Sequence, residues 1–218
     1  LDNLTINFLQ ESNNNIHDIA VSSGITSLDL FIFLKKNNVD FKLTISDKYS
    51  QINVKQGFIT KAFDSEQNLI FGYLGCFFAA DKNIFFPITE LIFKLLKKLK
   101  NCEFYDYKLN LFHPGVIEKI NNNKIQQIDY DIFSGKTDLK FNFIRCMNIL
   151  NTVYFSEELI IKAVENLKIS LSENGILLVG RTNEKGINNA TFFKFTENHF
   201  IVLQDVNLGS EIKTLVLR

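Results

Sequence analysis

The chain has 218 residues, 46% of them hydrophobic and 22% charged, a composition that can bury a large core and fits a single globular domain. Its 24 basic residues equal its 24 acidic residues, so the overall charge favours neither nucleic acid nor an anionic membrane as a partner. The longest uncharged apolar run, residues 69–80, is well short of the roughly 20 residues of a membrane-spanning helix.

The three cysteines, Cys76, Cys102 and Cys146, are odd in number, widely spaced and without a CxxC pair. This pattern indicates neither a disulfide framework nor a zinc site, and we expect no metal. A reducing compartment fits it best, so we expect a cytoplasmic protein.

Residues 16–28 predict a buried strand that runs through a tight turn of small residues, and residues 28–36 predict the helix that follows. Small side chains allow the backbone N–H groups and the helix N-terminus to approach a ligand closely. This is how the first strand–helix unit of a doubly wound sheet binds a nucleotide. The turn is therefore the expected cofactor site.

Strands and helices alternate over much of the remaining chain. Further strands are expected at 41–46, 124–130, 141–147 and 176–179. One helix is expected over 113–120 with Pro114 in its first turn, and another after the N-cap Ser156, closed by Gly175. Such alternation is typical of an α/β protein with a mostly parallel sheet.

The C-terminal part of the chain changes character. Residues 191–195 and 200–204 flank a turn at 196–198 and predict an antiparallel hairpin, and residues 212–217 predict one more strand. The expected fold is thus a doubly wound, mostly parallel sheet that ends in an antiparallel hairpin.

The turn resembles that of the class I S-adenosylmethionine-dependent methyltransferases. In that family an acid is followed by glycines at alternate positions, and Asp18, Ala20, Ser22 and Gly24 occupy those places here. Ser22, Ser23 and Gly24 are also similar to the Cys-Ser-Ser/Thr-Gly form of some subfamilies. Because alanine and serine tolerate positive φ less well than glycine, we expect this turn to be shaped differently.

The resemblance extends to the ends of the next strands. It implies that Asp47 binds both ribose hydroxyls, that Asp131 binds the adenine amino group and that Ile132 packs on the ring, with Asp129 as a competing candidate for Asp131. Residues 141–151 with Tyr154 and Phe155 are similar to chemotaxis-receptor methyltransferases. The cofactor-binding residues implied in this way are Asp18, Ala20, Ser22, Ser23, Gly24, Asp47, Asp131, Ile132 and Cys146.

Residues 48–112 form an insertion between the second strand and the following helix, within a single domain over 1–218. They predict a hairpin, 57–64 with 69–79, and an amphipathic helix. The helix has its apolar face at Ile88, Leu91, Ile92, Leu95, Leu96 and Leu99. The insertion leaves the carboxyl edge of the sheet, so we expect it to cover the substrate; the alternative is that it extends the core or forms a homodimer contact.

Only three arginines occur, Arg145, Arg181 and Arg218, and the first two lie at or near the carboxyl ends of the fourth and fifth strands. Since a guanidinium binds carboxylates and phosphates in a fixed geometry, Arg145 or Arg181 is predicted to bind an anionic group of substrate or cofactor. The alternative is a surface charge or a salt bridge. Asn148 and Asn151 are candidates for lining the acceptor side.

The implied activity is methyl transfer from S-adenosylmethionine to a small molecule, through an oxygen or carboxyl acceptor, because residues 148–151 lack the Asn/Asp-Pro-Pro-Tyr motif of amino-group methyltransferases. Methyl transfer needs no catalytic triad, and the three histidines show no triad spacing. Two alternatives stay open: an inert methyltransferase-like binding module, and an NAD-dependent oxidoreductase, for which residues 22–27 lack the Gly-x-Gly-x-x-Gly motif.

Overall fold

A computed structural model of the chain describes residues 1–57, 59–74, 78–81, 91, 94–95, 98, 103–135 and 137–218. The chain divides into two compact units. One comprises Leu1–Lys48 with Phe112–Arg218, and the other comprises Tyr49–Leu111.

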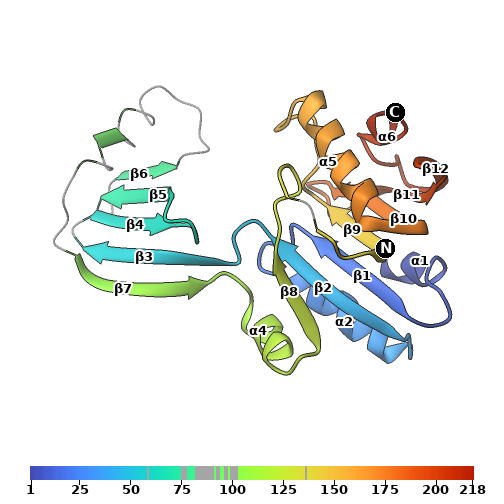
Figure 1. Cartoon of the computed structure of the whole chain (residues 1–218), viewed down its shortest axis with the longest axis horizontal. Coiled ribbons are helices and arrows are strands. Elements are labelled where there is room, and N and C mark those ends of the chain that lie inside the picture. The colour runs from blue at the N-terminus through green and yellow to red at the C-terminus, as the bar shows by residue number, and fades with distance from the viewer. Residues whose placement is uncertain are drawn as a thin grey trace. The chain divides into compact units, whose positions relative to one another are not determined.

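The first unit is built on a seven-stranded sheet with the order β12-β11-β10-β9-β1-β2-β8 (Figure 1). Its strands are β1 (Asn14–Ile19), β2 (Phe41–Asp47), β8 (Ile125–Asp129), β9 (Phe141–Met147), β10 (Leu171–Thr182), β11 (Asn188–Thr196) and β12 (His199–Val206). The pairs from β8 through β2, β1 and β9 to β10 are parallel, and β10, β11 and β12 pair antiparallel. The predicted α/β class with a C-terminal antiparallel hairpin is confirmed.

Helices cover both faces of this sheet. The helices are α1 (Asp2–Ile6), α2 (Ile25–Lys36), α4 (Pro114–Asn121), α5 (Glu157–Ser170) and α6 (Lys213–Val216). Leu34 of α2 and Val116 of α4 pack in one core cluster with Phe143, whereas Leu167 of α5 packs in the other with Ile144. Because successive residues of a strand point to opposite faces, adjacent residues of β9 supply the two clusters.

The helix starts follow the predicted capping chemistry. The Ser156 hydroxyl accepts a hydrogen bond from Leu159 N at the start of α5. In α4, Pro114 occupies the first turn, and the ring of His113 accepts from Gly115 N at 3.1 Å. The predicted cap Ser156 and the predicted first-turn Pro114 therefore mark where the two helices begin, and the His113 cap is an addition that the structure shows.

Three local predictions were wrong. Helix α2 begins at Ile25 rather than at residue 28, with Gly24 as its N-cap. Helix α5 ends at Ser170, and Gly175 lies in β10, beside a register irregularity between Leu171 and Ile176. The segment 212–217 forms α6 instead of a strand, because Ile212, Leu215 and Val216 all reach the core, which needs helical spacing.

The second unit is a five-stranded antiparallel sheet with the order β6-β5-β4-β3-β7. Its strands are β3 (Gln51–Gly57), β4 (Ile59–Phe63), β5 (Leu69–Leu74), β6 (Phe78–Asp81) and β7 (Glu103–Asn110). The predicted hairpin corresponds to β4 and β5, but the insertion holds a whole sheet that the sequence did not predict. Most of the predicted amphipathic helix, together with Cys76 and Cys102, lies outside the described residues.

No helix in the described part of the chain is long and apolar enough to cross a membrane. Of the three cysteines, the one that the structure describes, Cys146, is a buried free thiol.

Candidate functional site

The turn between β1 and α2 has left-handed backbone at every second residue. The φ angles are +58° at Ala20, +53° at Ser22 and +72° at Gly24. These are the three positions that the resemblance assigns to glycine, and all three have the left-handed backbone that glycine tolerates best. A Cβ on Gly24 would also come within 3.2 Å of the Val116 side chain, so that position needs glycine for its backbone and has little room for a side chain.

This turn lies where the sheet changes its winding direction. Strand β1 pairs with β2 on one side and with β9 on the other, and both pairings are parallel. In open α/β sheets a crevice forms at the carboxyl ends of such strands, and ligands bind in it. A cavity of about 430 Å³ lies there, a volume typical of small-molecule sites. Its lining includes Asp2, Asp18, Ala20, Ser22, Ser23, Ile25, Thr26, Asp29, Arg145, Met147, Asn148, Thr182 and Asn188.

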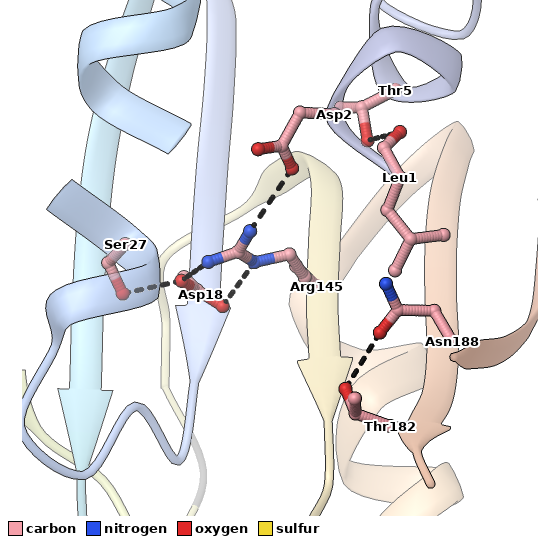
Figure 2. Close-up of polar contacts among 8 residues, drawn as sticks. All are labelled: Leu1, Asp2, Thr5, Asp18, Ser27, Arg145, Thr182 and Asn188. Atoms are coloured by element: carbon pink, nitrogen blue, oxygen red, sulfur yellow. Dashed lines mark hydrogen bonds and ion pairs between the residues drawn. The ribbon is translucent and has the colours of Figure 1, made fainter. Parts of the chain in front are cut away.

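An ion-pair network joins Asp18, Arg145 and Asp2 in the lining of this cavity (Figure 2). Arg145 donates from Nε and Nη2 to the two carboxylate oxygens of Asp18, at 2.9 and 2.5 Å. The Ser27 hydroxyl donates to Asp18 Oδ2 at 2.6 Å, and Arg145 Nη1 lies 3.5 Å from Asp2 Oδ1. Side chains from β1, β9, α2 and α1 are thus held together at one point.

Arg145 is committed to these internal partners. Burial lowers the pKa of its guanidinium, but the Asp18 carboxylate more than offsets this and raises the pKa above its usual value. Arg145 therefore stays charged and is only 6% exposed. Its guanidinium already binds a carboxylate, that of Asp18, through two parallel hydrogen bonds. The prediction that Arg145 binds an anionic substrate group is not supported, because that geometry is taken by Asp18.

The cavity as a whole is acidic. Three aspartates, Asp2, Asp18 and Asp29, face one arginine in its lining, which gives a net charge of −2. Ile25 and Thr26, the first residues of α2, lie in the same lining, and Gly24 offers no side chain to cap their N–H groups. The N–H groups at the helix N-terminus can bind a carboxylate, and the aspartates of the lining attract a cation. The cavity therefore suits a zwitterionic ligand with excess positive charge.

The two other predicted acids lie outside the lining of this cavity, and of the two Asp47 contacts the turn. Asp47, the last residue of β2, accepts a hydrogen bond from Ser22 N at 2.7 Å and so fixes the turn. Asp131 follows β8 and lies 2.9 Å from Lys48 Nζ. Burial raises the pKa of Asp131, but bonds from Lys48 and the Phe133 N–H outweigh it and hold the pKa below its usual range. Their cofactor roles stay predictions.

Three predicted site residues point into the protein instead. Ile132 and Cys146 are part of the core cluster under α5, with 4% and 0% exposure. Asn151 is 2% exposed, and its side chain accepts from Tyr154 N at 3.0 Å, which stabilises a local turn. None of the three lines the 430 Å³ cavity, and we leave them out of the proposed site.

Asn148 and Arg181 do reach cavities. Asn148 has φ +64° and accepts from Thr182 N at 2.7 Å, which joins the ends of β9 and β10 in the 430 Å³ cavity. Arg181 lines a second cavity of about 830 Å³ and lies 3.8 Å from Glu211, an ion pair that leaves 42% of its side chain exposed. Thr182 lines both cavities, so the two adjoin.

The sequence predictions did not include Asp2 and Asp29, which line the cavity, or Ser27, which is buried and bonds to Asp18. A helix predicted from Ile25, where α2 begins, would have placed Ser27 and Asp29 in its first turns, with Ser27 directed towards Asp18. The helix predicted from residue 28 left Ser27 outside. Asp2 carried no local signal, since it meets Arg145 through tertiary folding. Within the described residues, no group of three or more histidine, cysteine or acidic side chains is arranged to hold a metal.

Family models and curated protein sequences give no match to the chain. Among solved structures it is similar to the PH0226 protein from Pyrococcus horikoshii OT3, with a TM-score of 0.44 and 10% identity, over 99% of this chain and 74% of that one. It is similar to a SAM-dependent methyltransferase from Methanosarcina mazei, with a TM-score of 0.39 and 16% identity, over 81% of this chain and 56% of that one.

A third similar structure is the N-methyltransferase NodS from Bradyrhizobium japonicum WM9 in complex with S-adenosyl-L-homocysteine, with a TM-score of 0.37 and 12% identity, over 79% of this chain and 54% of that one. The chain spans 33% of the methyltransferase SibL and 56% of the Methanosarcina protein. The narrower resemblance to chemotaxis-receptor methyltransferases stays a prediction.

Proposed function

We propose that the chain binds S-adenosylmethionine in the 430 Å³ cavity and transfers its methyl group to a small acceptor. The observation that carries this proposal is the left-handed turn at Ala20, Ser22 and Gly24, which opens onto an acidic crevice at the carboxyl ends of β1 and β9. The turn brings backbone close to a ligand, and the acidic lining selects for positive charge.

The charge of the cavity separates the two candidate cofactors. S-adenosylmethionine carries a sulfonium and an ammonium group against one carboxylate, so a lining with net charge −2 attracts it. NAD carries a pyrophosphate, which the charges of Asp2 and Asp29 would repel, because Arg145 and Asp18 neutralise each other. The cavity therefore favours S-adenosylmethionine over NAD.

Residues around the cavity suit the parts of this cofactor. The N-terminus of α2 would bind the carboxylate of the methionine moiety, and Asp29 would attract its ammonium group. Asp47 is the candidate for the ribose and Asp131 for the adenine, as the sequence resemblance implies. When bound, the cofactor supplies an activated methyl group, and the protein supplies alignment and exclusion of water.

The acceptor is proposed to enter through the adjoining 830 Å³ cavity, where Thr182 connects it to the cofactor side. Arg181 there presents an exposed guanidinium for an anionic group of a small molecule. A carboxylate acceptor has no proton to lose, so transfer to it needs no general base. A small carboxylate-bearing acceptor fits these groups best.

Calorimetric titration with S-adenosylmethionine, S-adenosylhomocysteine and NAD tests the cofactor. We expect binding of the first two and none of NAD. Asp47→Asn is the informative variant, because it removes the charge proposed for the ribose while keeping an oxygen that accepts from Ser22 N. Exposed Asp138→Asn is the matched control. Preference for NAD would overturn the proposal, and cofactor binding without methyl transfer to any acceptor would indicate an inert binding module.

A further inference from the structure

Strand β7 is a long edge of the antiparallel sheet in the second unit. Within the described residues its only hydrogen-bonded neighbour is β3. It has eight residues and no proline, and its register with β3 is regular from Tyr105 to Asn110. Proteins usually protect sheet edges with short strands, prolines, bulges or charged side chains. β7 has no proline or bulge over that length, and its exposed charges, Asp106 and Lys108, are of opposite sign.

Two of the other three sheet ends show such protection in the described residues. β6, the opposite edge of the same sheet, has only four residues. β12, the edge of the larger sheet, is interrupted by a register shift opposite Phe192 and Phe193. β8, the other edge of the larger sheet, is regular over its five residues. Among the described edges, β7 has the longest regular register, over the six positions from Tyr105 to Asn110.

One face of β7 is apolar and exposed. Tyr105, Tyr107 and Leu109 alternate along the strand and so share a face, with exposures of 69%, 44% and 44%. Tyr107 lies directly opposite Val54 of β3, which is 6% exposed. The apolar face of the sheet thus continues to its edge and leaves large side chains uncovered there.

The other face of β7 carries opposite charges two residues apart. Asp106 has a 63% exposed side chain, 3.7 Å from Lys55 across the strand pair, and Lys108 is exposed as well. An acid and a base lie at this spacing with one residue between them. When two copies of the strand pair antiparallel, the acid of each copy can therefore face the base of the other.

We propose that β7 pairs antiparallel with β7 of a second copy of the chain, about a two-fold axis at Tyr107. In that register Asp106 faces Lys108 of the second copy, and this pair occurs twice. Tyr105 faces Leu109 twice, and Tyr107 faces its own equivalent. Opposite-charge and aromatic cross-strand pairs are the units that stabilise sheets, and the paired backbone joins two five-stranded sheets into one.

The charges select this register over its neighbours. Along a strand, successive residues point their backbone N–H and C=O groups to alternate edges. Two facing residues must either both point these groups towards the partner strand or both point them away. Two identical antiparallel strands can meet this condition only when the two-fold axis passes through a residue and not between two residues. An axis at Asp106 sets two carboxylates opposite each other, and an axis at Lys108 sets two ammonium groups opposite each other. Like charges in direct opposition destabilise pairing, so the axis at Tyr107 is favoured.

Sedimentation equilibrium of the whole chain over about 1–300 µM, a range set by micromolar affinity, is the first test. We expect a monomer–dimer equilibrium that Lys108→Asp weakens by about tenfold or more, because it creates two like-charge pairs. The double variant Asp106→Lys/Lys108→Asp restores opposite charges and should recover the dimer. Lys124→Asp, an exposed change in the first unit, is the matched control and should leave it unchanged.

Cross-linking tests the register without altering charge balance at the axis. In a background with Cys76→Ser and Cys102→Ser, Tyr107→Cys should form an intermolecular disulfide, because facing Cα atoms in antiparallel pairs lie about 4.5–5.5 Å apart. Leu109→Cys is the matched control: its equivalents would be separated by about four residues along the strands, roughly 14 Å, beyond disulfide reach, and both charge pairs stay intact. A monomer throughout the range, a dimer unaffected by Lys108→Asp, or equal cross-linking of the two cysteine variants would each overturn the proposal.

Discussion

Arg145 on β9 holds both carboxylate oxygens of Asp18, the residue directly opposite it on β1. The acid that the sequence motif assigns to the cofactor is thus already paired with an arginine of the same chain. Ser27 adds a third bond to Asp18 from the first turn of α2. Asp18 therefore shapes the site by fixing two strands and a helix below it.

Breaking this pair should be costly for stability. Arg145→Met leaves the Asp18 carboxylate buried without its cation, so the free energy of unfolding should fall by about 3–5 kcal/mol. Arg218→Met removes an arginine from an exposed ion pair with Glu157 and should change it by less than about 1 kcal/mol. Urea unfolding followed by circular dichroism measures both, and equal losses in the two variants would contradict a structural role for the buried pair.

Two adjacent serines test the backbone of the turn. Ser22 and Ser23 are both exposed, but only Ser22 has positive φ, at +53°. Left-handed backbone costs a residue with a Cβ about 1–2 kcal/mol, whereas glycine elsewhere costs conformational entropy. Ser22→Gly should therefore be more stable than Ser23→Gly by about 1 kcal/mol in thermal unfolding. The reverse order would show that the turn is not left-handed at residue 22.

His17 predicts acid sensitivity of the fold. Burial lowers its pKa to about 4, against a smaller opposing effect of Asp18, and its Nε2 lies 2.8 Å from Ser46 Oγ. Because the unfolded chain binds this proton below pH 6.5, the stabilisation is complete above pH 6.5 and falls towards pH 4, by about 3 kcal/mol.

Unfolding free energies between pH 4 and 7 should show this loss in the unmodified protein and a shallower slope in His17→Gln. His199→Gln, which changes an exposed histidine whose Nδ1 faces the Glu197 carbonyl, is the control and should leave the slope unchanged. Identical slopes in all three proteins would mean that His17 is not the titrating group.

Asp29 should contribute to cofactor affinity through charge alone. It lines the acidic cavity and is exposed, so Asp29→Asn should weaken S-adenosylmethionine binding about two- to fivefold, as expected for a solvent-screened interaction. The difference should shrink in high salt. Calorimetry at two salt concentrations measures this, and an effect that is independent of salt would point to a lost hydrogen bond.

Local patterns predicted most of the first unit. Alternating apolar runs placed β2, β8, β9 and the terminal hairpin within a few residues of their observed bounds, because strand periodicity and turn residues are encoded in neighbouring positions. Helix starts at Ser156 and Pro114 followed for the same reason. The errors at Gly175 and at 212–217 arose where burial against the core, rather than local propensity, selects the conformation.

The sequence by itself determined the α/β alternation, the turn after β1 and the acids at the ends of β1 and β2, since each depends on residues close together in the chain. Only the tertiary structure decided what those groups do. Asp18 and Arg145 are 127 residues apart and meet because two parallel strands bring them into register. Burial of that pair removes Arg145 from substrate binding, and burial likewise removes Ile132, Cys146 and Asn151 from the site. Side-chain partners and exposure depend on the packing of distant elements, which no local pattern records.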